Sequence, residues 1–195
     1  MKLNRAALTL GLAAILAVLV LASWAVQRGA SGGGKALIGG PFLLVDQDGK
    51  AVDEGVLKGK VSAVFFGFTH CPDVCPGTLQ ALSAAAAQLG PAKSRDLQVL
   101  FVSVDPERDT PPVLKLYLDS QRMPVRTLGL TGTPAQIKQI AAAYRVFYEK
   151  APQAGTYTMN HTSTVYLMDK QGRFDRVMAF GMTPAEMADQ IDLAL

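Results

Sequence analysis

Cysteine and histidine are scarce in this chain, which has two of each in 195 residues. Two cysteines exclude a small scaffold held together by several disulfides. Two cysteines and two histidines at the spacing found here also exclude an ordinary Cys₂His₂ zinc cage. Charged residues make up only 18% of the chain, against 49% hydrophobic residues, and this balance excludes a disordered polypeptide. The sequence therefore predicts a folded protein whose length suits one domain with an appendage.

A basic surface is lacking outside the N-terminal segment. Four of the 19 Lys and Arg residues lie in residues 1–40, which contain no acid, so 15 basic residues oppose all 16 Asp and Glu in the remainder. A nucleic-acid-binding domain would instead show a clustered basic stripe. We therefore expect no nucleic-acid partner.

Residues 6–26 form a run of 21 residues without a charge. About 20 apolar residues in a helix span the hydrocarbon core of a bilayer. Lys2 and Arg5 precede the run and Trp24 lies near its far end, the arrangement typical of a helix whose N-terminus stays in the cytoplasm. A cleaved signal peptide is the alternative, although its apolar core is usually shorter.

The domain organisation follows from this run. We expect residues 1–28 to be a membrane anchor or signal segment and the Gly-rich residues 29–40 to be a flexible linker. Residues 41–195 then form one exported domain that is long enough to bury a core. With an intact anchor, the protein crosses the cytoplasmic membrane once and its domain faces the periplasm.

Two nearly continuous apolar segments, Val61–Phe68 and Leu97–Val104, predict strands buried on both faces, as in a parallel sheet covered by helices. Thr78–Leu89 has helical spacing between them. A hairpin near residues 42–52 precedes them, and a second hairpin is expected from 164–168 and 174–179. The order predicts an α/β fold: a thioredoxin-like mixed sheet flanked by helices, in addition to the N-terminal transmembrane helix.

Three further helices are expected to start at Thr-Pro pairs. Thr133 and Thr183 each begin a capping box, with Gln136 and Glu186 as the third helical residues. The helix after Thr110 has apolar residues that we expect to face the core. These are Val113, Leu116 and Tyr117.

Both cysteines lie in one short segment, Cys71-Pro-Asp-Val-Cys75, between the first long strand and its helix. Sites in open α/β sheets form beyond the carboxyl ends of strands. If the helix starts here, both thiols lie on one face of it, near an N-terminus that stabilises thiolates. Such a pair can bind a soft metal, exchange disulfides or form a structural bridge, and Asp73 between them is expected to cap exposed amides.

His161 stands in a loop just before the strand at 164–168. If that strand runs antiparallel beside Val61–Phe68, His161 faces Cys71 and Cys75 across the sheet edge. Two thiolates and an imidazole suit copper, either Cu(I) or Cu(II), and zinc accepts the same donors.

The remaining polar and sulfur-containing candidates receive other roles. His70 is expected at the surface or as a support, and Met159 and Met168 in the core. The segment Asp105-Pro-Glu-Arg-Asp109 is open to two interpretations. It is either a charged turn that leads into a helix or a polar cluster that supports the site or meets a partner.

The segments just described resemble the Sco/SenC family of copper chaperones. The resemblance covers nearly the whole exported domain, in the family's order. It rests on residues 66–76 (FGFTHCPDVCP), 103–110 (SVDPERDT), 128–132 (LGLTG), 143–146 (AYRV) and 160–163 (NHTS).

The resemblance implies a membrane-tethered, thioredoxin-like domain that binds one copper ion through Cys71, Cys75 and His161. It also implies a role in assembling the dinuclear copper site of cytochrome c oxidase subunit II, with other copper chaperones or thiol reductants as further partners. Two alternatives stay open at this point. One is a thiol–disulfide oxidoreductase that reduces the cysteines of that copper site, with Cys71 and Cys75 as its redox pair. The other is a redox or copper sensor.

Overall fold

The computed structural model describes residues 38–195. The expected anchor (residues 1–28) and most of the expected linker (29–40) lie outside the described residues. Among the helices that the structure describes, none is both long and apolar enough to cross a membrane.

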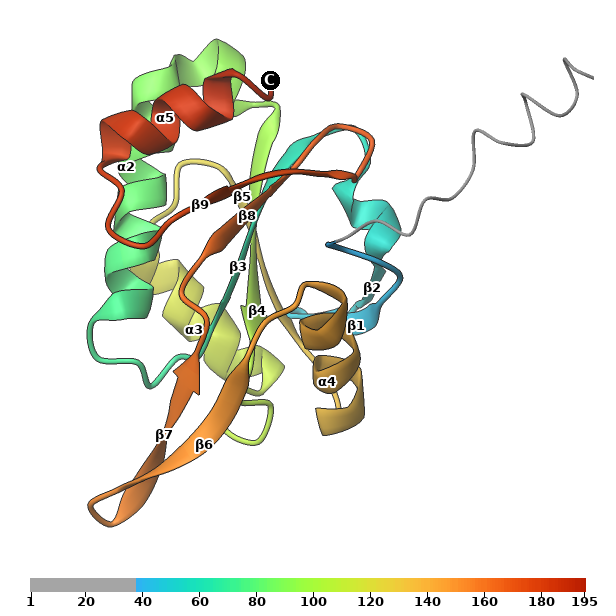
Figure 1. The fold of residues 1–195 in the computed structure, drawn as a ribbon, viewed down its shortest axis with the longest axis vertical. Coiled ribbons are helices and arrows are strands. Elements are labelled where there is room, and N and C mark those ends of the chain that lie inside the picture. Colours follow the sequence, from blue (N-terminus) through green and yellow to red (C-terminus); the bar gives the residue numbers. More distant parts are fainter. Residues whose placement is uncertain (1–37) are drawn as a thin grey trace, which may run out of the picture. The chain divides into compact units, whose positions relative to one another are not determined.

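A seven-stranded mixed sheet forms the centre of the domain (Figure 1). Its strand order is β2-β1-β5-β4-β3-β8-β9, with β3, β4 and β5 parallel and the other neighbouring pairs antiparallel. The strands are β1 (Leu43–Asp46), β2 (Ala51–Asp53), β3 (Val61–Gly67), β4 (Leu97–Ser103), β5 (Arg126–Thr131), β8 (Val165–Met168) and β9 (Phe174–Met178). This sheet confirms the expected α/β architecture.

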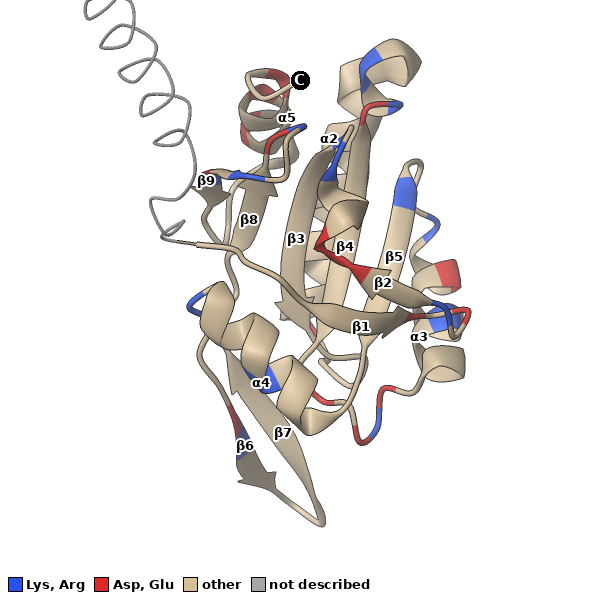
Figure 2. Ribbon diagram, turned by 90° about the vertical axis from the view of Figure 1, so that its right-hand side faces the viewer, with Lys and Arg blue, Asp and Glu red and all other residues tan. Residues whose placement is uncertain are grey.

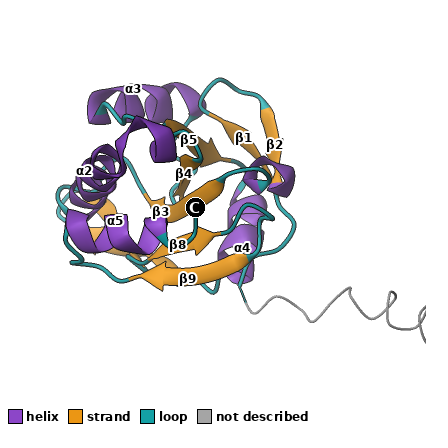
Figure 3. Cartoon of the chain, turned by 90° about the horizontal axis from the view of Figure 1, so that it is seen from above, coloured by secondary structure: helices purple, strands orange, loops and turns teal. Residues whose placement is uncertain are grey.

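Helices cover both faces of the sheet. They are α2 (Val74–Ser94), α3 (Pro111–Gln121), α4 (Pro134–Ala143) and α5 (Pro184–Asp192), with a short 3₁₀ helix η1 at Glu54–Leu57. Helices α2, α3 and α5 lie on one side and α4 on the other (Figure 3). Along the ribbon in Figure 2, Lys and Arg positions are interspersed with Asp and Glu positions.

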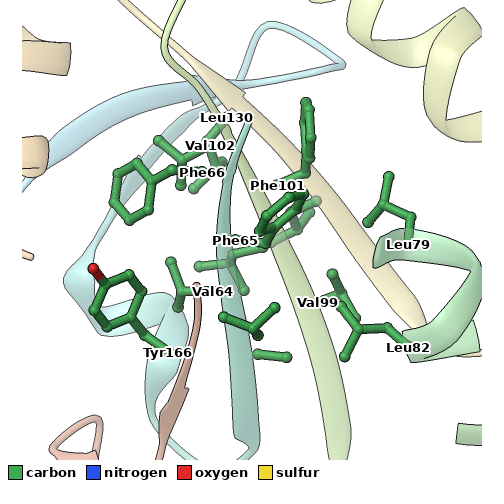
Figure 4. Close-up of a cluster of buried hydrophobic side chains, with 14 of the residues drawn as sticks. Val64, Phe65, Phe66, Leu79, Leu82, Val99, Phe101, Val102, Leu130 and Tyr166 are labelled. Atoms are coloured by element: carbon green, nitrogen blue, oxygen red, sulfur yellow. The ribbon is translucent and has the colours of Figure 1, made fainter. Parts of the chain in front are cut away.

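The core lies on both faces of β3, where every residue is buried. Successive side chains of a strand point to opposite faces of the sheet. On one face, Phe65 packs against Phe101 with ring centroids 6.0 Å apart. Phe66 points the other way, to Tyr144 and Tyr166 (Figure 4). The buried apolar run thus explains why β3 is central, and its carboxyl end is held rigidly on both sides.

Helix α2 begins at Val74, four residues earlier than the apolar spacing predicts. Its backbone leaves the helical conformation at Gly90, where φ is 74°, directly after the expected end at Leu89. The earlier start brings Cys75 into the first helical turn and leaves Cys71 in the preceding turn.

The expected inner face of α3 is wrong in part. Leu116 is 74% exposed, whereas Leu114 and Leu118 are buried. The five apolar residues at positions 113–118 form two overlapping apolar stripes on the helix, and either stripe could face the sheet. Gly129 of β5 lies beneath Leu114 and Leu118 and has no side chain to exclude them, so this stripe packs on the sheet.

Candidate metal centre

Cys71 and Cys75 lie just beyond the carboxyl end of β3, and both are free thiols. The amide of Cys71 donates to the carbonyl of Phe68 at 3.3 Å, which closes the turn between strand and helix. Cys75 is completely buried, whereas Cys71 is partly exposed. The pair therefore has one accessible and one inaccessible sulfur.

The sulfur of Cys71 accepts a hydrogen bond from the amide of Cys75 at 3.4 Å. Asp73 occupies the N-cap of α2, but its side chain makes no capping hydrogen bond, so the expectation that Asp73 caps exposed amides is wrong. The Cys71 sulfur instead takes an amide of the first helical turn. Amides at a helix N-terminus stabilise negative charge.

The two thiols have opposite pKa shifts. A hydrogen bond from the Cys75 thiol is the main cause that lowers the pKa of Cys71 to about 4, with smaller contributions from His161 and nearby amides and opposition from burial. The same hydrogen bond, followed by burial, raises the pKa of Cys75. Cys71 is therefore the thiolate of the pair and Cys75 its proton donor.

His161 reaches this pair from a distant part of the chain. Its Nε2 lies 3.6 Å from the Cys75 sulfur, although the two residues are 86 positions apart. The other ring nitrogen, Nδ1, is 3.0 Å from the carbonyl oxygen of Thr162. With the proton assigned to Nδ1, that nitrogen donates to Thr162 and leaves Nε2 free as a ligand, an arrangement common for histidines that bind metals.

Two phenylalanine rings enclose the imidazole. Phe65 and Phe68 meet it edge-on, with ring centroids at 6.4 and 5.8 Å. These contacts restrict the orientation of the imidazole ring. Neither ring contact was predicted from the sequence, because an apolar residue carries no sign of the distant side chain that it touches.

The topology behind His161 is as expected, but its local structure is not. β8 runs antiparallel to β3 and pairs Val165 with Phe65, which brings the start of β8 to the cysteine end of the sheet. However, His161 is the last residue of a strand, not part of a loop. Strand β7 (Thr156–His161) pairs with β6 (Tyr148–Gln153) in a two-stranded hairpin.

This hairpin, which projects beyond the central sheet in Figure 1, was not predicted from the sequence. β6 contains Pro152 and exposed charged residues, which weaken a strand pattern. Gly155, with φ of 72°, forms the turn between the strands. The glycine and the alternating Tyr157 and Met159 after it are the signals that were available.

The other candidates lie where they were expected. The His70 side chain is 54% exposed and its Nδ1 lies 3.1 Å from the Thr69 hydroxyl, while Met159 and Met168 are buried in the core. Asp105 and Asp109 are both buried, at 1% and 0% exposure. An exposed charged turn therefore does not describe these two residues.

The donors at this edge suit a soft metal, although no compact metal-ligand group is preformed. Within residues 38–195, no three His, Cys, Asp or Glu side chains are gathered as a ready metal site. Cys71 and Cys75 nevertheless lie next to each other, and the free Nε2 of His161 lies 3.6 Å from the Cys75 sulfur. Thiolates favour Cu(I) and imidazole favours Cu(II), while the same atoms also accept zinc or, without metal, form a disulfide.

Comparisons with known proteins identify relatives of this chain. The chain is 43% identical over 153 residues to mitochondrial SCO1 homolog 1 of Arabidopsis thaliana. The aligned region covers 78% of this chain but only 45% of that relative, so the chain spans less than half of its length. It matches the copper-bound structure of Bradyrhizobium japonicum ScoI with 46% identity and a TM-score of 0.74, over 81% of this chain and 99% of that one.

A more distant structure is that of BsSco, described as having a disulfide switch and as a member of the Sco family of cytochrome c oxidase assembly proteins. It is 28% identical with a TM-score of 0.63, over 80% of this chain and 91% of that chain. The family model SCO1/SenC matches residues 30–195. Because this match covers most of the chain, the chain belongs to the SCO1/SenC family.

Proposed function

We propose that this protein is a copper-binding metallochaperone that carries one copper ion and assists assembly of the dinuclear copper site of cytochrome c oxidase subunit II. One observation carries the proposal: His161 Nε2 lies 3.6 Å from the sulfur of Cys75. A disulfide exchanger has no need of an imidazole with a free nitrogen beside its buried thiol. A carrier of Cu(I) and Cu(II) gains a third ligand from it.

The relatives support the same activity. ScoI of B. japonicum has been solved with copper bound, and BsSco belongs to a family of cytochrome c oxidase assembly proteins. Copper is the cargo in this proposal. Cys71, Cys75 and His161 bind it, and the Phe65 and Phe68 rings keep the imidazole in place.

The proposal includes a membrane tether formed by residues 1–28, with the domain in the periplasm. Its basis is the uncharged run at residues 6–26, which follows Lys2 and Arg5. We expect the full-length protein to remain in the membrane fraction after an alkaline carbonate wash. Recovery of a soluble product that starts near Val26 contradicts the tether, because it indicates cleavage.

The substitution His161→Ala tests the carrier function. Two thiolates suffice for Cu(I), whereas Cu(II) gains more from nitrogen. We therefore expect His161→Ala to weaken Cu(II) binding much more than Cu(I) binding and to abolish or strongly shift the sulfur-to-Cu(II) charge-transfer band. His70→Ala removes the other of the two histidines and is the matched control, with both affinities near wild type.

Assembly in cells completes the test. Cells that carry only the His161→Ala protein are expected to fail in cytochrome c oxidase assembly, although the protein still reduces a small disulfide. A Cu(II) spectrum unchanged by His161→Ala contradicts the ligand assignment.

The second candidate is a thiol–disulfide oxidoreductase, and the asymmetry of the cysteine pair favours it. The accessible Cys71 thiolate attacks a partner disulfide, forms a mixed disulfide and releases one partner thiol. Cys75 then attacks that mixed disulfide, which releases the second partner thiol and leaves the Cys71–Cys75 disulfide. Two electrons pass to the partner. Normal oxidase assembly with His161→Ala supports this function over copper delivery.

A further inference from the structure

The connection between β4 and α3 contacts both parts of the candidate metal centre, which are the turn that carries the cysteines and the hairpin that carries His161. On the cysteine side, Asp109 accepts hydrogen bonds from the Thr69 amide at 3.0 Å and the Thr69 hydroxyl at 2.6 Å. It also accepts one from the Ser103 hydroxyl at 2.6 Å. Thr69 is two residues before Cys71, so Asp109 ties the cysteine turn to the end of β4.

On the histidine side, Arg108 reaches the β6–β7 hairpin. Its Nη1 donates to the carbonyl of Tyr157 at 2.9 Å, and its guanidinium lies 3.8 Å from the centre of the Tyr157 ring. Its Nε donates to buried Asp105, which also accepts from the Tyr157 hydroxyl at 2.9 Å. Arg108, Asp105 and Tyr157 thus form a closed set of contacts between the connection and β7.

The same guanidinium is linked to His161 by a second path. It lies 5.9 Å from the centre of the Phe68 ring, and Phe68 meets the His161 imidazole edge-on. Tyr157 precedes His161 by four residues in β7. Arg108 therefore contacts both the strand that carries the histidine and one of the rings that enclose it.

We propose that Arg108 is a positioning residue that holds the β6–β7 hairpin so that His161 lies beside Cys75. An isolated two-stranded hairpin is at best marginally stable. In the described part of the chain, β6 and β7 pair only with each other and not with the central sheet. Their placement therefore depends on side-chain contacts, and those of Arg108 and Asp105 are the most buried polar ones.

The exposed ion pair of the hairpin is a weaker candidate for this task. Lys150 and Glu107 also join the hairpin to the connection, at 2.6 Å, but their side chains are 46% and 58% exposed. Exposed ion pairs contribute little to stability. The planar guanidinium of Arg108 makes two directed hydrogen bonds and stacks on an aromatic ring, a combination that lysine cannot reproduce.

The role of Arg108 is separable from a general structural role because the cysteines are held independently. Cys71 and Cys75 are placed by β3, α2 and Asp109, whereas His161 is placed by the hairpin. Loss of Arg108 contacts should therefore displace the imidazole and leave the thiols in place. This inference rests on the proposed function, in which His161 serves Cu(II) more than Cu(I).

Arg108→Lys is the main test, since it keeps a positive charge beside Asp105 but loses the fork and the stacking. We expect Cu(II) affinity to fall by about 10- to 100-fold, the usual effect of losing a residue that orients a ligand, with a shifted charge-transfer band. Cu(I) affinity should stay within about twofold of wild type, because Cu(I) is satisfied by the two thiolates.

Tyr157→Phe is a milder variant that removes only the hydroxyl bond to Asp105, and it carries the test if Arg108→Lys does not fold. It should change Cu(II) binding in the same direction but less. Arg173→Lys is the matched control. Arg173 pairs with Asp169 through a 2.9 Å Nε bond in the turn between β8 and β9, away from the cysteines, and its substitution should change neither affinity.

Hydrogen exchange in the copper-free protein gives a readout that does not depend on copper. We expect Arg108→Lys to speed exchange of amides in residues 148–161 and to leave those of β3 unchanged. A wild-type protein that takes up no copper defeats the proposed function, whereas exchange still tests Arg108. The positioning role is overturned if Cu(II) affinity and hairpin exchange both match wild type, or if Cu(I) and Cu(II) binding weaken equally.

Discussion

At the scale of single residues, the packing around Cys75 leaves no room for a side chain at Gly67. A Cβ atom at this position would lie 2.9 Å from the Cys75 sulfur and 2.7 Å from a ring carbon of Phe101. Gly67 ends β3, so the close approach of strand and helix depends on the missing side chain. The burial of Cys75 is therefore determined partly by a glycine eight residues before it.

We predict that Gly67→Ala destabilises the protein by about 1–3 kcal/mol, the usual cost of overpacking a core. The substitution should also displace the Cys75 sulfur and shift the Cu(II) charge-transfer band. Denaturant unfolding and visible absorption measure the two effects.

Gly77→Ala is the control for this substitution. Gly77 lies in α2, and a Cβ there meets nothing within 4 Å. Because alanine is favoured over glycine in a helix by up to about 1 kcal/mol, Gly77→Ala should be neutral or stabilising. Equal stability of the two variants would contradict the packing argument.

At the scale of elements, three helices begin at Thr-Pro pairs, and the two that were expected to have a capping box do have one. Thr133 and Thr183 accept from the amides of Gln136 and Glu186, which complete the capping boxes of α4 and α5. Thr110 makes no side-chain capping bond at α3. Pro112 removes one amide that a cap would use, and Val113 has no side-chain acceptor for a reciprocal bond.

We predict that Thr133→Ala and Thr110→Ala differ in their effects, although both remove an N-cap threonine before proline. Thr133→Ala should lower the free energy of unfolding by about 1 kcal/mol, the usual value of a cap. Thr110→Ala should change it by less than about 0.5 kcal/mol, as at an ordinary surface position. Chemical denaturation of both variants measures the difference, and equal losses would show that Thr110 also caps its helix.

At the scale of the whole molecule, the proposed function makes copper binding and thiol oxidation compete for the same two sulfurs. Joining the Cys71 thiolate to the Cys75 thiol removes two electrons and one proton and leaves neither sulfur free to bind a metal. A cysteine sulfur must be deprotonated to bind a metal. The redox state of the pair therefore decides whether the copper site exists.

We predict that the reduced protein binds one copper ion and that the oxidised protein binds essentially none at this site. Native mass spectrometry of the detergent-solubilised full-length protein, with and without a thiol oxidant, measures the stoichiometry. Cys71→Ser is a useful comparison, because it cannot form the disulfide and should bind little copper in either condition. Equal uptake by reduced and oxidised wild-type protein would mean that the cysteines are not the ligands.

Local features whose physical causes lie within a few residues could be predicted from the sequence alone. The apolar runs of β3 and β4, the capping boxes of α4 and α5 and the position of the cysteine pair between strand and helix all follow from short-range patterns. The motifs also identified Cys71, Cys75 and His161 as the residues to examine. The mixed sheet with its flanking helices followed from the order of these elements.

Features that depend on contacts between distant segments could not be predicted in this way, because they are set by packing. The inner face of α3 was chosen by Gly129 of another strand, and the hairpin that carries His161 is held by Arg108 from a third segment. The sequence left buried Asp105 and Asp109 open to two interpretations, a charged turn or a polar cluster, because burial is a property of packing and not of residue type. The distance between His161 and Cys75 is likewise set by the side chains packed around both residues, because the chain between them is too long to set it.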